Sequence, residues 1–219
     1  DSDVRVASEI ATWMPGYKEL SVGNHLFMTI QWMLSSFANE GKAFFIAIWA
    51  AGFLLLVKSK KAKVYQSLAV VFSVVALLPY AGISFFSEMG IGYIDIEQCL
   101  TELPTWQTMT TQNRIAFFWW IAAVLFTLVL LWKVTGHSVF ISMAFLGGIA
   151  SEAVLHFSPT IYASGARVYY LTDLMYLFII LWMVMRMDSE KKKNLFIAGA
   201  AALGIINFLS QYSIMLLKL

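Results

Sequence analysis

The chain has little cysteine and few charged residues. Its single cysteine, Cys99, excludes an internal disulfide and any metal site built from several cysteines. Only 13% of its 219 residues are charged, against about a quarter in an average soluble domain, whereas 60% are hydrophobic. The charges gather in short stretches between long uncharged runs. This composition indicates a membrane protein.

Motifs that mark common catalytic and nucleotide-binding sites are also missing. The chain contains no Walker A sequence, GxGxxG, HExxH or GxSxG. Its lysine-rich stretches are short, so we expect them to set topology and contact anionic lipid rather than nucleic acid. Asp95, Glu97 and Glu102 match no metal-ligand spacing and are interpreted as part of a solvated acidic loop. We therefore expect neither a metal nor a nucleic-acid partner.

What the chain does contain is a series of apolar runs, most of them close to the ~20 residues that cross a bilayer as a helix. The first run is short and begins at Lys42, whose ammonium we expect to reach the membrane surface. The sequence therefore predicts an all-α polytopic helix bundle. The six predicted spans are Lys42–Val57, Val64–Phe86, Ile115–Trp132, Ser138–Phe157, Val168–Met185 and Asn194–Leu217.

Basic residues predict the orientation of these spans. Alternate links hold nine of the fifteen lysines and arginines, and basic links lie on the cytoplasmic side of a membrane. Both termini are therefore predicted to lie outside. The nine residues are Lys58, Lys60, Lys61, Lys63, Lys133, Arg186, Lys191, Lys192 and Lys193.

The predicted organisation has two parts. Residues 1–41 are expected to form an external polar segment, and residues 42–219 a six-helix transmembrane domain with an external loop at 87–114. The chain opens DSDVRVASE, without a Met or a signal peptide, so we expect it to be a piece of a longer polytopic protein. The external segment contains one helix, which either lies on the membrane or extends the first span. Its apolar face is predicted to comprise Leu26, Ile30, Met33, Leu34 and Phe37.

The stretch HFSPTIYASGAR, residues 156–167, concentrates hydrogen-bonding groups between two apolar runs. Ser158 and Pro159 suit a helix start, and Gly165 allows a tight turn. Arg167 stands at the mouth of the fifth span, and an arginine beside hydroxyls and free N–H groups suits a phosphate. The alternative is an arginine that anchors its helix among lipid headgroups. The predicted phosphate-binding residues are Arg167, Ser158, Thr160, Tyr162, Ser164 and Gly165.

Glu152 lies inside the fourth predicted span, where a carboxylate is costly unless it is paired or reached by water. His156 follows four residues later, hence on the same helical face, so the two could hold a proton or orient a ligand hydroxyl. The small residues before Glu152 would let another helix come close, namely Gly147, Gly148, Ala150 and Ser151. The alternative is a structural hydrogen bond from Glu152 to another helix or to Arg167.

The fifth span contains a second acidic residue, Asp173, which completes the predicted intramembrane polar site with Glu152 and His156. It does not share a helical face with Arg167. We expect it to pair with Arg114 or with a serine on another span. In the second span Pro79 predicts a kink.

The stretch around Arg167 resembles the C-terminal half of bacterial multi-spanning glycosyltransferases of the GT-C type. The resemblance extends loosely over Asn39–Met187, including FANEGKAFFIAIWAAGFLLL. It implies a polyprenyl-phosphate-linked sugar as donor substrate, no further cofactor, a glycan or lipid acceptor outside, and a location in the bacterial plasma membrane. It also implies that the arginine faces the lipid phosphate and that a catalytic acid lies in an earlier external loop, which this chain does not place. The matching residues are Ser158, Pro159, Thr160, Tyr162, Ser164, Gly165 and Arg167.

Three functions therefore fit the sequence. The first is a membrane glycosyltransferase, or its C-terminal part, whose polar residues gather at the external face. The second is a transporter or flippase-like module with Glu152 and His156 as its site, which would show polar residues at mid-membrane in several spans. The third is a non-catalytic membrane partner, whose polar residues only pack helices.

Overall fold

The computed structural model describes residues 2–13, 16–81, 106, 107, 109–136, 138–157 and 169–217. Within these residues the chain forms helices and turns, with no strand, which confirms the predicted all-α class. The α-helices are α1 (Ser2–Trp13), α2 (Val22–Ser36), α3 (Lys42–Leu56), α4 (Lys63–Leu77), α6 (Thr111–Val134), α7 (Val139–His156), α9 (Tyr170–Met185) and α10 (Glu190–Leu217). Short helical turns are η1 (Tyr17–Glu19), η2 (Phe37–Gly41), η3 (Lys60–Ala62) and η4 (Leu78–Ala81).

Several of these helices are long and apolar enough to cross a membrane. They cover Val22–Leu56, Asn113–Val134, Val139–His156 and Glu190–Leu209, and the apolar helix Tyr170–Met185 is shorter. Such helices indicate an integral membrane protein.

The longest of them changes one predicted boundary. Helices α2 and α3 are joined by the π-helical turn η2 into one continuous helix of 35 residues. The boundary predicted between residues 41 and 42 falls inside this helix. The backbone of α2 therefore extends the first predicted span, as the alternative prediction had it. The reason is that η2 keeps helical hydrogen bonding through a polar Asn-Glu-Gly stretch.

The second predicted span ends earlier as an α-helix than the sequence suggested. Helix α4 ends at Leu77, and the chain continues as the 3-10 turn η4, which contains Pro79. Proline has no N–H to donate, so an α-helix commonly breaks or tightens there. The rest of that span, residues 82–86, lies outside the described residues.

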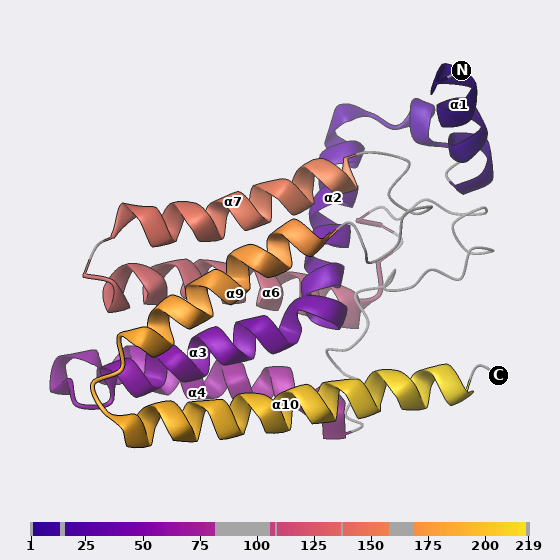
Figure 1. Cartoon of the computed structure of the whole chain (residues 1–219). Helices are drawn as coiled ribbons and strands as arrows, with labels where there is room; N and C mark the ends of the chain where they lie inside the picture. Colours follow the sequence, from indigo (N-terminus) through magenta and orange to yellow (C-terminus); the bar gives the residue numbers. More distant parts are fainter. Residues whose placement is uncertain are drawn as a thin grey trace.

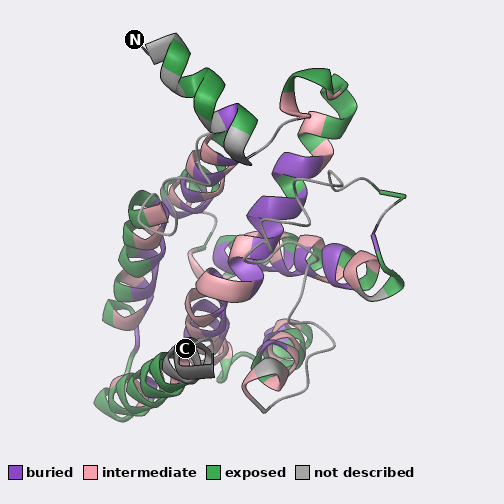
Figure 2. Cartoon of the chain, turned by 90° about the vertical axis from the view of Figure 1, so that its right-hand side faces the viewer, coloured by how far each residue is buried: buried purple, intermediate pink, exposed green. Residues whose placement is uncertain are grey.

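The helices α3, α4, α6, α7, α9 and α10 run alongside one another, and the links that follow α3, α6 and α9 lie at the same end of the bundle (Figure 1). These are the basic links of the sequence, so they share one end of the bundle; their placement on the cytoplasmic side stays a prediction. Helix α3 contacts α4, α6, α9 and α10. Figure 2 shows that α10 is exposed along most of its described length, as expected for a lipid-facing helix.

Aromatic side chains fill the centre of the bundle. Phe45 of α3 is fully buried, and its ring contacts those of Trp49, Trp120, Phe145 and Tyr176 at centroid distances of 5.5–6.1 Å. Edge-to-face and tilted aromatic pairs of this kind add to the stabilisation from apolar burial. The core therefore ties α3, α6, α7 and α9 together.

The apolar face predicted for the external helix is only partly correct. Leu34 and Phe37 are buried, but Leu26 and Ile30 are exposed. Instead, Met28 and Trp32 are buried against Tyr17 and Leu20 of the N-terminal segment. The reason is that α2 packs against α6 and α7 as well as against this segment. It therefore buries side chains over more of its circumference than a single apolar face.

Candidate functional site

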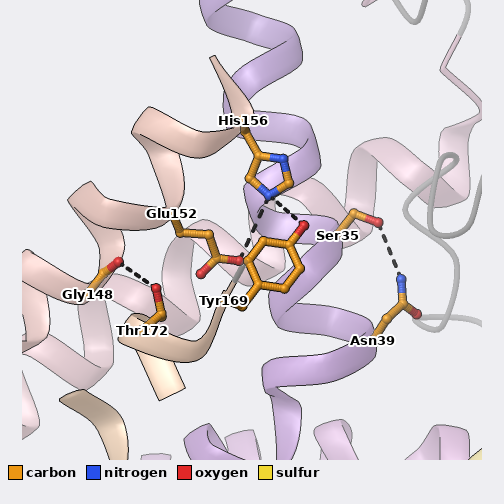
Figure 3. A network of polar contacts seen from close by, with 7 residues as sticks. All are labelled: Ser35, Asn39, Gly148, Glu152, His156, Tyr169 and Thr172. Atoms are coloured by element: carbon orange, nitrogen blue, oxygen red, sulfur yellow. Dashed lines mark hydrogen bonds and ion pairs between the residues drawn. The ribbon is translucent and has the colours of Figure 1, made fainter. Parts of the chain in front are cut away.

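The strongest polar cluster of the described chain starts from Glu152 and His156 on α7. The two side chains lie one helical turn apart and both are buried, with exposures of 2% and 4%. Nε2 of His156 lies 3.9 Å from Oε1 of Glu152 (Figure 3). The predicted Glu–His pairing on one face is therefore present in the structure.

Helix α9 completes this pair because it packs closely against α7. A Cβ at Gly148 would lie 3.1 Å from Cε1 of Tyr176, and the hydroxyl of Thr172 donates to the Gly148 carbonyl at 3.2 Å. The close approach predicted for the small residues is thus confirmed at Gly148. It brings the Tyr169 hydroxyl to 3.3 Å from Nε2 of His156, as Figure 3 shows.

The third contribution comes from the junction of α2 and α3. Ser36, Glu40 and Asp173 lie close enough to the Glu152 carboxyl group to interact with it. Glu40 sits in the π-helical turn η2, and π-turns of this kind often occur at functional sites. Asn39, directly before Glu40, donates from Nδ2 to Oγ of Ser35 at 3.3 Å.

Sequence reasoning missed Ser36, Glu40 and Tyr169. The signal for Glu40 was present, because a carboxylate within a continuous membrane-length helix is itself a candidate functional residue. It was overlooked because residues 1–41 were assigned to an external segment. Ser36 and Tyr169 come to the cluster from other parts of the chain. The spacing of residues along one helix cannot predict such contacts.

Three polar atoms in this cluster have no hydrogen-bond partner among the described residues: Oε1 of Glu152, Nδ1 of His156 and the hydroxyl of Tyr176. When Tyr169 donates to Nε2, neutral His156 carries its proton on Nδ1 and becomes a donor there. A buried polar atom without a partner costs about 1–3 kcal/mol. The cluster can therefore accept and donate hydrogen bonds to a ligand rich in hydroxyl groups.

The N-terminal segment covers the end of α7 beside this cluster. The Tyr17 hydroxyl donates to the carbonyl of Phe157 at 2.6 Å, and partial burial raises the pKa of Tyr17. The His25 ring lies edge-on to Tyr17, and its Nε2 lies 3.0 Å from the Tyr17 carbonyl oxygen. Residues far apart in the sequence thus enclose the last turn of α7.

The remaining predicted residues are distributed as follows. Asp173 lies half-buried on α9, whereas Arg114, one of its expected partners, donates to the carbonyls of Trp106 and Gln107. Within the described ranges no three acidic, histidine or cysteine residues are arranged to hold a metal ion. The predicted phosphate-binding residues lie outside the described residues: Ser158, Thr160, Tyr162, Ser164, Gly165 and Arg167.

Comparison of the chain with protein-family models, with curated proteins and with solved structures finds no match. The functional argument therefore depends on the site alone. That site is a buried cluster of carboxyl, imidazole and phenol groups, contributed by α7, by the η2 turn after α2, and by α9 with its N-cap Tyr169.

Proposed function

We propose that the chain is an integral-membrane glycosyltransferase, or the C-terminal part of one. It transfers a sugar from a polyprenyl-phosphate donor to a glycan or lipid acceptor on the outer side of the membrane. The single observation that carries this proposal is the buried cluster around Glu152 and His156, whose unsatisfied polar atoms suit the hydroxyl groups of a sugar.

The cluster is well placed for a ligand that is half sugar and half lipid. It lies between apolar helices with lipid-facing surfaces, so a polyprenyl chain can remain in the membrane while its polar head reaches the cluster. A carboxyl group can accept and donate hydrogen bonds, so it can pair with sugar hydroxyls. Glu152 is assigned this binding role.

The phosphate half of the donor is assigned to the segment between α7 and α9. His156 is in the last turn of α7, and Tyr169, which contacts it, lies two residues after Arg167 in the sequence. We propose that Arg167 binds the lipid phosphate. The predicted supporting groups are the turn at Gly165 and the hydroxyls of Ser158, Thr160, Tyr162 and Ser164. A guanidinium there would offset the charge that develops on the departing phosphate.

The reaction itself has a simple balance. An acceptor hydroxyl attacks the anomeric carbon of the donor sugar, forming the new glycosidic bond, and the bond from that carbon to the phosphate oxygen breaks. The polyprenyl phosphate leaves with the electron pair, and the acceptor proton passes to a base. The resemblance implies that this base is an acidic residue in an earlier external loop, and we assign it to no residue of this chain.

The phosphate half is tested with Arg167→Ala, in nanodiscs that contain undecaprenyl phosphate. Loss of one charge-assisted hydrogen bond predicts weaker binding by about 1.5–3 kcal/mol. Arg186→Ala is the matched control, because Arg186 lies over the Trp182 ring at the opposite end of α9. Equal affinity of Arg167→Ala and the wild type would remove the phosphate assignment.

One observation favours a second candidate, a transporter. Polar side chains from α2, α7 and α9 meet at Glu152, and polar groups contributed by several helices at membrane depth are what a transport site requires. This candidate predicts uptake of a polar solute into proteoliposomes that Glu152→Gln abolishes. The transferase predicts no such uptake and instead binding of the lipid-linked sugar.

A further inference from the structure

A second polar site lies away from this cluster, around Lys42. Lys42 is the first residue of α3, and it is buried, with only 8% of its surface exposed. Its ammonium does not pair with any carboxylate of the described residues. Nζ instead lies 4.5 Å from the centroid of the Tyr80 ring of η4.

This arrangement differs from what the sequence predicts for Lys42. A lysine near the end of a membrane helix usually extends its ammonium into water at the membrane surface. Here most of the side chain is buried, and the ammonium lies over the face of the Tyr80 ring. A cation–π contact is weaker than pairing with an anion, and it uses the ring face while leaving the three N–H donors without an oxygen acceptor.

The surroundings of Lys42 are held in place by a hydrogen bond between two other helical elements. The Tyr80 hydroxyl donates to Oδ1 of Asn207 on α10 at 2.7 Å. The oxygen of Asn207 is thereby directed to Tyr80, and its amide nitrogen remains as a further donor. The site therefore offers a cation and an amide donor, which is the chemistry that binds a phosphate oxygen.

The flanking surfaces are those of a lipid site. Leu77 lies three residues before Tyr80 and is exposed, and Ile206 and Leu209 next to Asn207 are also exposed. In a membrane these faces contact acyl chains, because no other described part of the chain covers them. A ligand with an anionic head and apolar tails would match both the cation and the surfaces beside it.

We propose that Lys42, with Tyr80 and Asn207, binds the phosphate group of an anionic lipid where α3, η4 and α10 meet. This site is separate from the Glu152 cluster, because Lys42 faces η4 whereas the neighbouring Glu40 lies near α7 and α9. The proposal therefore does not depend on sugar transfer, and it applies equally to a transporter or to a structural membrane protein.

The test measures lipid binding to the delipidated full chain in detergent by native mass spectrometry. The wild type, Lys42→Met and Lys18→Met are titrated with phosphatidylglycerol and with phosphatidylcholine. Lys18 is an exposed lysine on η1 and serves as the matched control. Lys42→Met is expected to weaken phosphatidylglycerol binding by at least about tenfold, while Lys18→Met leaves it unchanged.

Two further arms make the outcome decisive. Lys42→Arg keeps the cation and is expected to retain the preference for phosphatidylglycerol. Inorganic phosphate is added at millimolar concentration: competition would assign the site to a soluble phosphate ester, and no competition assigns it to the lipid headgroup.

The melting temperature shows whether Lys42→Met still folds. Removing a charge that has no anionic partner among the described residues is expected to leave the lipid-free protein as stable as the wild type, or more stable. Phosphatidylglycerol should raise the melting temperature of the wild type but not that of Lys42→Met. If Lys42→Met binds phosphatidylglycerol as tightly as the wild type does, or if the wild type prefers phosphatidylcholine, the proposal is wrong.

Discussion

The contact between α7 and α9 predicts the effect of adding a single methyl group. At Gly148, an alanine Cβ would lie 3.1 Å from Cε1 of Tyr176, 3.6 Å from Cβ of Met175 and 3.7 Å from Cγ2 of Thr172. Carbon atoms in good contact lie ~3.5–4.0 Å apart, so the first distance is too short. Tyr176 is 1% exposed and packs against Phe145, so its ring has little room to move.

Gly148→Ala is therefore expected to destabilise the protein. Inserting a methyl group into a well-packed contact costs about 1–3 kcal/mol. The matched control is Gly147→Ala on the same helix, where an added Cβ meets nothing within 4 Å. Alanine favours a helix over glycine by up to about 1 kcal/mol in both variants, so this term cancels in their difference. That difference should be about 1–3 kcal/mol in favour of Gly147→Ala.

The measurement is unfolding of both variants by SDS or heat in one detergent. The reasoning would be refuted if Gly148→Ala were as stable as Gly147→Ala, because α7 and α9 could not then be in the contact described. The same contact positions Tyr169 beside His156, so Gly148→Ala should also weaken binding of a sugar-bearing lipid, whereas Gly147→Ala should not.

Two further predictions concern residues away from the site. Thr127 accepts a hydrogen bond from Nε1 of the buried Trp49 at 2.7 Å, so Thr127→Val should cost about 1–3 kcal/mol in the same unfolding assay, whereas Thr127→Ser should cost less. Asp188 bonds Lys58 and Lys192 at 2.7 and 2.9 Å, and these bonds lower its pKa from 3.8 to about 2. Because the folded pKa lies below the unfolded value, the stabilisation is complete above pH ~4 and is lost as the pH falls towards 2. The melting temperature of the wild type should therefore fall more over this window than that of Asp188→Asn, and 1 M salt should reduce the difference.

Much of the fold could be predicted because long apolar runs leave few alternatives. A run such as Ile115–Trp132 must satisfy its backbone internally at membrane depth, and α6 covers it. The clustering of lysines in alternate links likewise predicted that these links share one end. The junction at Glu40 could not be predicted, because a polar Asn-Glu-Gly stretch is typical of the end of a span. In the structure this stretch forms the π-helical turn η2 within a continuous helix.

The site was predictable only where it lies along one helix. Glu152 and His156 are four residues apart, so their shared face follows from helical geometry alone. Tyr169 and Ser36 belong to other helices, and their positions follow from how close α9 and α2 pack to α7. Lys42 shows the same limit: its sequence position suggests an ammonium in water, but its contact with Tyr80 depends on where η4 lies.

The most direct test of the central claim compares two lipids that differ only in the sugar. Affinities for undecaprenyl phosphate and for its glucosylated form are measured with the wild type, Glu152→Gln and the exposed control Glu190→Gln. The account predicts that the wild type and Glu190→Gln prefer the sugar-bearing lipid and that Glu152→Gln loses this preference while still binding the bare lipid phosphate. A wild type without the preference, or a Glu152→Gln variant that keeps it, would contradict a sugar site at Glu152.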